Sequence, residues 1–370
     1  MTSTLDVGAE FSAAQTGAAE RLVLERLEGA QLAFLGGSLA VGLGTATSDV
    51  DLYVVGSRLR GEASFEQDGV EVHVNAMSGG EVRKLIELGS DYRATGADRS
   101  QLTIPLESLS GLVRLLTGRQ LLITPAWARD LSRLDARVVR RILISRNANV
   151  FSACAEDVFG ALSSGDVYTA VAASGLALEA ACEAILAAAG DVYVGPKFLF
   201  RRLDRTPVTQ PWCRPLWRLL NTAFGAAAEP LPEAAETVVR QRLLAGNLLL
   251  ATAAIEGWDQ PLAALPPIPS EYRHGPRRSP YFAPVRFADG WALIGPGDGY
   301  EVSEETVRLW QELTGRGLPA DAHPDPAVAV SELHRVGAVE SDLPVPDAAG
   351  ERFVRPSPRF SCRPRQDWEH

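Results

Sequence analysis

The chain has 370 residues, of which 46% are hydrophobic and 22% are charged, a composition typical of soluble globular proteins. Its length suffices for two or three domains. The net charge is 36 − 46 = −10, which repels nucleic acid at long range and argues against a general nucleic-acid-binding protein. No apolar run reaches the roughly 18 residues of a membrane helix, and the N-terminus lacks the basic and apolar segments of a secretory signal. We therefore expect a cytoplasmic protein with no membrane partner.

The first part of the chain alternates between helical and strand patterns. Apolar residues at helical spacing predict a helix over residues 10–28. Short apolar runs predict strands over 31–35 and 50–55, and alternation of Val with polar residues predicts another strand over 70–74. This grouping of strands behind a leading helix indicates an α+β domain, to which we assign residues 1–110.

The pattern then becomes mostly helical up to about residue 250. The clearest example is an Ala-rich stretch of small and aliphatic residues. Asp166 is placed to cap the start of this helix, and Gly190 is placed to end it in the left-handed conformation. We assign residues 111–258 to a helical domain.

A break in composition follows the helical part. Seven prolines between residues 260 and 285 exclude a continuous helix and predict a linker over 259–284. After it come a strand, a loop and a helix, then one more helix and strand, which predicts a small domain over 285–345. Residues 346–370 are rich in Pro and Arg, and we expect them to form a loosely ordered tail.

The most informative segment is FLGGSLAVGLGTATSDVDLYVVG, residues 34–56. It begins with a strand and a Gly-Gly-Ser turn, in which Gly37 allows close backbone approach and the Ser38 hydroxyl adds a donor for phosphate oxygens. Asp49 and Asp51 follow, two apart on the next predicted strand, so both side chains point to one face. We expect this pair of carboxylates to hold one or two Mg²⁺ ions against a polyphosphate.

A third carboxylate is expected from the neighbouring strand. Glu71 is the candidate because the alternation of residues 70–74 places it on a polar face. Asp68 and Glu66 are rivals if the strand is shifted in register, and His73 shares the face of Glu71. The alternative to the whole constellation is an exposed Asp-x-Asp strand edge next to an ordinary glycine turn.

These motifs resemble the polymerase-β-like nucleotidyltransferases. The Gly-Gly-Ser turn, the Ser-Asp-Val-Asp-Leu strand and the Val-Glu-Val strand are most similar to the bacterial branch that includes the aminoglycoside (kanamycin) nucleotidyltransferases. The resemblance covers residues 20–80 and extends more loosely to 250. It implies a nucleotidyltransferase domain with a mixed sheet, followed by a helical substrate-binding domain. The implied nucleotide contacts are Gly37, Ser38 and Ser48, and the implied metal ligands are Asp49, Asp51 and Glu71.

The same resemblance suggests roles in the helical part. The kanamycin-modifying relatives use a helix glutamate as general base and a nearby lysine at the phosphates. Glu179 and Glu183 lie four residues apart on one face of the Ala-rich helix, and we prefer Glu179 as the base. Lys197 would be the lysine that stabilises pyrophosphate. The alternative is a pair of solvated glutamates on a surface helix.

The apolar spacing over residues 291–339 resembles small winged-helix-like modules such as the PqqD-like peptide chaperones. That resemblance implies a peptide partner. The alternative is a small domain that covers the core or mediates dimerisation.

The chain is therefore expected to be a Mg²⁺-dependent nucleotidyltransferase. It would move a nucleoside monophosphate from an NTP, with ATP the expected donor, to a hydroxyl of a small molecule and release pyrophosphate. The acidic charge favours a cationic or neutral acceptor, so antibiotic resistance and natural-product biosynthesis both fit, as does a homodimer. Two alternatives stay open: nucleotidylation of a peptide or protein, and a nucleotide-binding regulatory protein without turnover.

Overall fold

The chain divides into two compact units in the computed structural model, which describes residues 10–45, 47–222, 231–267, 275–315, 323–345 and 350–360. The N-terminal unit comprises the described residues of Met1–Tyr92 together with Ile104–Val139 and Val192–Arg201. The C-terminal unit comprises Arg93–Thr103, Arg140–Asp191 and the described residues of Arg202–His370.

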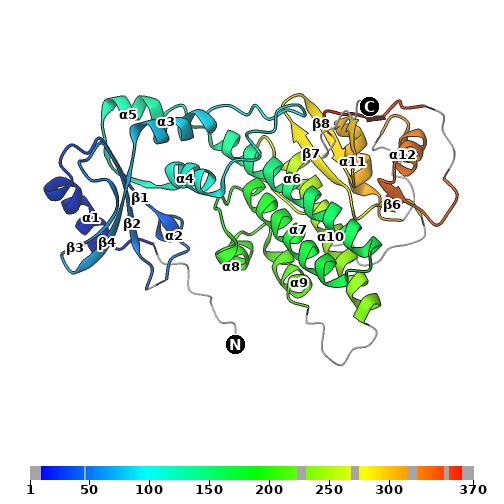
Figure 1. Cartoon of the computed structure of the whole chain (residues 1–370), viewed down its shortest axis with the longest axis horizontal. Helices are drawn as coiled ribbons and strands as arrows, with labels where there is room; N and C mark the ends of the chain where they lie inside the picture. The colour runs from blue at the N-terminus through cyan, green and yellow to red at the C-terminus, as the bar shows by residue number, and fades with distance from the viewer. Residues whose placement is uncertain are drawn as a thin grey trace, which may run out of the picture. The chain divides into compact units, whose positions relative to one another are not determined.

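The N-terminal unit is built on a mixed five-stranded sheet of order β3-β4-β2-β1-β5 (Figure 1). β2 and β4 are parallel and the other neighbours are antiparallel, which confirms the expected α+β class with a mixed sheet. The strands are β1 Leu32–Gly36, β2 Val50–Val55, β3 Gly61–Gln67, β4 Val70–Met77 and β5 Arg119–Ile123, and the helices are α1 Ala13–Arg26, α2 Gly37–Ala40, α3 Gly79–Leu88, α4 Leu106–Thr117 and α5 Pro125–Leu131.

Alternation along the strands gives this sheet one apolar face. Leu35 of β1, Leu52 of β2 and Val72 of β4 lie in one buried cluster with Leu22 and Val23 of α1. The residues between them in sequence point to the opposite face. The sheet therefore has one face closed by α1 and another that carries polar side chains.

Two strands of this sheet were missed by the sequence prediction. β3 exposes most of its side chains and so lacks an apolar alternation; it is joined to β4 by Asp68 and Gly69, both at positive φ (53° and 75°), the conformation of a tight hairpin turn. β5 lies in a stretch that we expected to be helical, yet it pairs with β1. The predicted domain boundary after residue 110 is therefore wrong.

The C-terminal unit has a helical core in which α7 and α10 pack against each other (Figure 1). Asp166 caps the start of α7 by accepting from the Thr169 N–H, and Gly190 follows its end at φ +90°, both as predicted. The helices are α6 Ala136–Ser163, α7 Val167–Ala188, α8 Leu199–Arg205, α9 Gln210–Leu220 and α10 Leu231–Glu256. The first residues of α6 and α8, and a short 3₁₀ turn η1 at Pro196–Phe198, belong to the N-terminal unit.

Although no apolar run of about 18 residues is expected, two described helices have the length and apolar composition of a membrane span. Among the described residues, Val167–Ala188 and Glu233–Glu256 both reach it by composition, yet 67% and 83% of their most apolar windows are buried inside the fold. Their apolar surface is therefore used in the core of the unit.

A second sheet, of order β11-β9-β8-β7, lies in the same unit. Its strand β7 contacts α10, and the Ser145 hydroxyl of α6 donates to the Arg286 carbonyl at 2.8 Å. The remaining elements are β6 Arg277–Arg278, β7 Ala283–Phe287, β8 Gly290–Ile294, β9 Gly299–Val302, α11 Glu304–Glu312, α12 Pro326–Arg335, β10 Val339–Glu340 and β11 Val354–Pro356. The predicted separate domain is therefore packed onto the helical core, and the predicted linker already contains β6 and the start of β7.

The described part of the expected loose tail, residues 350–360, is held at a few buried residues, although most of its residues are exposed. Val354 and Phe360 are fully buried. The Glu332 carboxylate of α12 accepts the backbone N–H groups of residues 352, 353 and 354 at 2.8, 2.7 and 2.9 Å. This buried carboxylate therefore ties β11 to α12, while β11 also pairs with the edge of β9.

Candidate active site

The Gly-Gly turn lies where the polar face of the sheet meets the end of β1. Gly36 pairs with Asp51 across the β1–β2 ladder, and Gly37 has φ +76°. A Cβ atom at Gly37 would lie 2.3 Å from Asp51 Oδ2, and one at Gly36 would lie 2.7 Å from the Tyr53 ring. Only glycine fits at either position, because the space that a side chain would take is filled by the neighbouring strand.

The loop that leads to Asp49 is closed by its own hydrogen bonds. The Leu43 N–H donates to the Ser38 carbonyl at 2.8 Å. The Thr45 N–H donates to the Ser48 hydroxyl at 2.8 Å, and the Ser48 N–H donates back to the Thr45 carbonyl at 3.0 Å. Ser48 therefore fixes the turn that places Asp49 immediately before β2.

A pocket of about 290 Å³ lies beside this turn, within the N-terminal unit. The lining residues come from the Gly37–Asp51 segment, from α4 and from the segment after Asp191. Most of them carry hydroxyl or charged groups: Ser38, Thr45, Thr47, Ser48, Asp49, Asp51, Ser110, Arg114, Thr117, Tyr193 and Lys197. Two carboxylates, two cations and many hydroxyls thus line one pocket, as a site for a phosphorylated ligand requires.

Asp51 has the most perturbed electrostatics of the pocket. Burial raises the pKa of its carboxyl, the Arg114 guanidinium opposes that shift, and the Asp49 carboxylate adds to it. Burial also raises the pKa of Tyr53 to about 12, and Arg114 lies 5.5 Å from the centre of its ring. Asp49 and Asp51 therefore repel each other, and a bound cation would relieve that repulsion.

Glu71 is not among the residues that line the pocket. The register places His73 opposite Asp51, and the His73 Nε2 atom lies 3.8 Å from Asp49 Oδ1 and 3.9 Å from Glu71 Oε1. Within the described ranges, no group of three or more His, Cys, Asp or Glu side chains is arranged to hold a metal ion. The structure therefore does not bring the predicted three carboxylates together as a metal site among the described residues, and the His73 imidazole contacts both Glu71 and Asp49. Ser64 holds that imidazole by a 2.8 Å hydrogen bond to Nδ1.

The rival carboxylates lie elsewhere on the sheet. Asp68 is in the β3–β4 turn and pairs with Arg21 of α1 at 2.5 Å. Glu66 is on β3, opposite Glu71 in the ladder. The candidate metal ligands of the pocket are therefore Asp49 and Asp51.

Lys197 lines the pocket, together with Tyr193, from a segment far along the chain. The segment is attached to the loop that leads to Asp49 by Arg201, whose Nη1 donates to the carbonyls of Leu43 and Gly44 at 3.0 and 3.2 Å. The chain contains two lysines, Lys84 and Lys197, against 34 arginines. One of the two is thus placed where a compact ammonium can meet a phosphate.

The structure distinguishes the two candidate bases on α7. Glu183 accepts a 2.6 Å hydrogen bond from the fully buried Arg202, so its carboxylate is engaged within the C-terminal unit. Glu179 has no ion-pair partner among the described residues, and burial raises the pKa of its carboxyl. Glu179 belongs to the C-terminal unit and is not among the residues that line the pocket, so its role as general base stays a prediction.

The sequence prediction missed the contribution of α4. Ser110, Arg114 and Thr117 line the pocket from one side of this helix. Their spacing of four and three residues is a signal that was present in the sequence, because such positions share a helix face. It gives the pocket a second cation and two more hydroxyls.

A likeness to known proteins is found among solved structures. No protein-family model matches the chain, and no curated protein matches its sequence. Among solved structures, the chain is similar to a nucleotidyltransferase-like protein from Exiguobacterium sibiricum 255-15, at 14% identity and a TM-score of 0.34 over 64% of this chain and 78% of that chain. A likeness at this level carries no functional argument, so the function has to be inferred from the residues of the pocket.

Proposed function

We propose that the chain is a Mg²⁺-dependent nucleotidyltransferase that moves a nucleoside monophosphate from an NTP to a hydroxyl group of a small molecule. One observation carries the proposal: the Asp49–Asp51 pair shares a pocket with a side-chain-free turn at Gly37 and with the Lys197 ammonium. Each part alone has an ordinary structural explanation. Together they provide ligands for a divalent cation, room for a polyphosphate and a charge for the leaving group.

The donor set of the pocket fits Mg²⁺. Mg²⁺ prefers oxygen ligands and commonly takes only one or two protein carboxylates, completing its coordination with water and substrate phosphates. Asp49 and Asp51 would hold it, and their mutual repulsion, which contributes to the raised pKa of Asp51, favours a cation there. When bound, the metal would neutralise charge on the phosphates. Glu71 is not required for this coordination.

The residues of the chain would then act in distinct roles. Ser38 and Ser48, with the backbone at Gly37, would hold the triphosphate of the NTP. Glu179 would take the proton from the acceptor hydroxyl, whose oxygen forms a new bond to the α-phosphorus. The bond between that phosphorus and the bridging oxygen breaks, and pyrophosphate leaves with the electron pair beside Lys197. Most of the catalysis would come from positioning and charge neutralisation.

The acceptor proposed is a small cationic or neutral molecule, as the overall charge of −10 favours. Modification of an antibiotic and tailoring of a natural product are both in this class. A peptide presented by the second sheet is less favoured, because β11 already pairs with the edge of β9 on which a peptide strand would add.

Transfer of label tests the proposal. The chain is incubated with Mg²⁺, each α-labelled NTP and a panel of amino-sugar and alcohol acceptors. We expect label on the acceptor and one pyrophosphate released per label, with both lost in Asp51→Asn and retained in Glu20→Gln, an exposed carboxylate of α1. Release of pyrophosphate at the same rate in Asp51→Asn would contradict the proposal.

A further inference from the structure

The segment that carries Lys197 is flanked by two residues of the C-terminal unit, Asp191 and Arg202, that form an ion pair with each other. Residues 192–201 belong to the N-terminal unit, whereas Asp191 and Arg202 on either side belong to the C-terminal unit. Arg202 Nε donates to Asp191 Oδ1 at 2.9 Å, and its Nη2 donates to the Asp191 carbonyl at 2.8 Å. The two ends of the segment are therefore bonded directly to each other.

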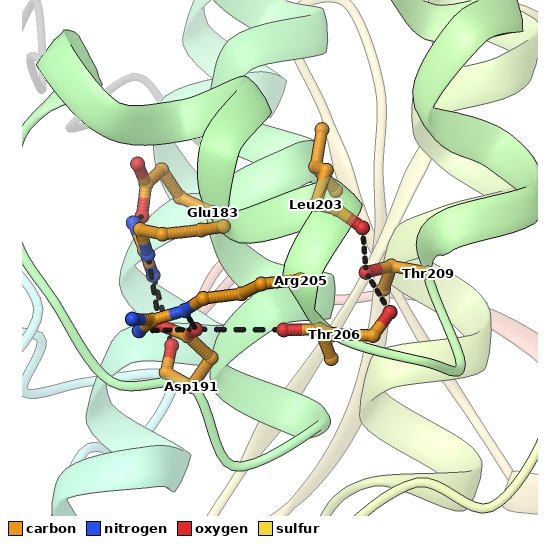
Figure 2. A network of polar contacts seen from close by, with 7 residues as sticks. Glu183, Asp191, Leu203, Arg205, Thr206 and Thr209 are labelled. Atoms are coloured by element: carbon orange, nitrogen blue, oxygen red, sulfur yellow. Dashed lines mark hydrogen bonds and ion pairs between the residues drawn. The ribbon is translucent and has the colours of Figure 1, made fainter. Parts of the chain in front are cut away.

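This ion pair is buried and further supported by neighbouring residues; Figure 2 shows Asp191 close to Glu183, Arg205 and Thr206. The Arg202 side chain is 0% exposed and that of Asp191 is 8% exposed. Glu183 of α7 accepts from Arg202 Nη1 at 2.6 Å, and Arg205 donates from Nε to Asp191 Oδ2 at 2.8 Å. Thr206 donates to the same oxygen at 3.4 Å. Every polar atom of the Asp191 carboxylate thus has a donor.

Within the segment, the Lys197 ammonium lies 5.1 Å from the centre of the Phe198 ring, which in turn packs edge-on against Tyr193. The Lys197 side chain is exposed, and Gly195 before it has φ +121°. The Arg201 contact to the Leu43 and Gly44 carbonyls fixes the end of the segment. Tying the two ends of a loop together removes most of the conformations that the residues between them can adopt.

We propose that Asp191, Arg202 and Glu183 form a clamp that positions the Lys197 segment for the polyphosphate. This inference rests on the proposed function for its purpose, although the clamp itself can be tested without turnover. Arg202 is a positioning residue in this scheme, because it acts through Lys197. A misplacement of about 1 Å at a catalytic group can cost about 100-fold in rate, so loss of the clamp should have a large effect.

The small number of lysines makes a direct test possible. A protease specific for lysine has two sites in the chain: Lys197 in the segment, and Lys84, exposed in the middle of α3, as an internal reference. The full-length wild type is compared with Arg202→Met and with the matched control Arg242→Met. Arg242 is also buried in the C-terminal unit, where it donates to carbonyls of α7 and α9.

We expect Arg202→Met to raise the rate of cleavage after Lys197 by about tenfold or more, because opening of the segment no longer has to break a buried ion pair. Cleavage after Lys84 should not change. Arg242→Met should leave the ratio of the two rates as in the wild type. If Arg202→Met does not fold, Glu183→Gln carries the same prediction with a smaller ratio.

Equal acceleration at both lysines, or no acceleration at Lys197, would overturn the clamp and leave Arg202 as an ordinary stabilising residue. NTP–Mg²⁺ binding by the same variants separates this result from the proposed function. Weaker NTP binding in Arg202→Met with normal binding in Arg242→Met supports the clamp and the function together. If the wild type binds no NTP but Arg202→Met still exposes Lys197, the clamp stands and the proposed function fails.

Discussion

The two units use carboxylates in opposite ways. In the pocket of the N-terminal unit, Asp49 is 75% exposed in its side chain and Asp51 lies against it with a raised pKa. In the C-terminal unit, Asp191 and Glu332 are buried and surrounded by donors. A carboxylate left without donors beside another carboxylate costs stability, whereas a buried one with all its hydrogen bonds supports the fold. The difference indicates which aspartates are kept for a ligand.

The largest expected effect contrasts Asp51 with Asp191. Asp51→Asn should lower nucleotidyl transfer at least about 1,000-fold while leaving the free energy of unfolding unchanged or slightly raised, because a repulsive charge is removed. Asp191→Asn should instead lower the free energy of unfolding by about 3 kcal/mol, since it leaves Arg202 without part of its buried ion pair. Urea unfolding and transfer assays on both variants measure this. A large loss of stability in Asp51→Asn would break the comparison.

The next effect concerns the proposed base. Glu179→Gln should lower kcat about 100-fold or more with little change in the KM for NTP. Because burial raises the pKa of Glu179, wild-type activity should fall as the pH is lowered through that raised pKa, and the variant should lose this acidic limb. A pH profile of kcat for both proteins is the measurement. An unchanged acidic limb in the variant would assign it to another group.

The third effect concerns Glu332, a buried carboxylate that we expect to stabilise the fold. Burial alone would raise its pKa, but the three backbone N–H donors outweigh burial and hold the pKa below its ordinary value of 4.5. The carboxylate therefore stabilises the fold above the unfolded pKa, and this contribution is lost as the pH falls through the folded pKa. Glu332→Gln should cost about 2–4 kcal/mol at pH 7. Urea unfolding at pH 7 and at pH 3 should show the difference between the proteins shrink at the lower pH, and a constant difference would contradict this role.

The smallest effect concerns the kind of cation at Lys197. Lys197→Arg keeps the charge but replaces a compact ammonium with a planar fork, so we expect about a tenfold loss in kcat/KM. Lys197→Met should lose more than Lys197→Arg. Lys84→Arg on α3 is the matched control and should behave as the wild type. Steady-state rates with NTP measure these values of kcat/KM. An equal loss of kcat/KM in Lys197→Arg and in Lys84→Arg would contradict a role for Lys197 in the site.

Local patterns in the sequence were sufficient for the parts of the fold with strong periodicity. β1, β2, β4 and α7 follow apolar patterns and cap signals, which depend on neighbours in sequence. β3 was missed because most of its side chains are exposed, so its sequence shows no apolar alternation. Its place in the sheet depends on its pairing with β4. β5 was missed because its place beside β1 depends on a contact distant in sequence.

The same distinction applies to the site. The sequence marks Gly37, Asp49 and Asp51 because they lie in one short motif, and the pocket does bring them together. It does not show that His73 lies within 4 Å of both Glu71 and Asp49, because that depends on the register of β2 with β4. It also does not show Arg114 in the pocket, which depends on how α4 packs on the sheet. A single sequence therefore does not predict which side chains from distant elements, such as His73 and Arg114, are brought to the site by packing.

The most direct test of the proposed site is calorimetric binding of ATP, GTP, CTP and UTP, each with Mg²⁺, to the wild type and to Asp49→Ala/Asp51→Ala. We expect Mg²⁺-dependent binding of at least one NTP by the wild type and its loss in the double variant, with an unchanged unfolding midpoint. Failure of the folded wild type to bind any NTP, or equal binding by the double variant, would contradict a nucleotide site at Asp49 and Asp51.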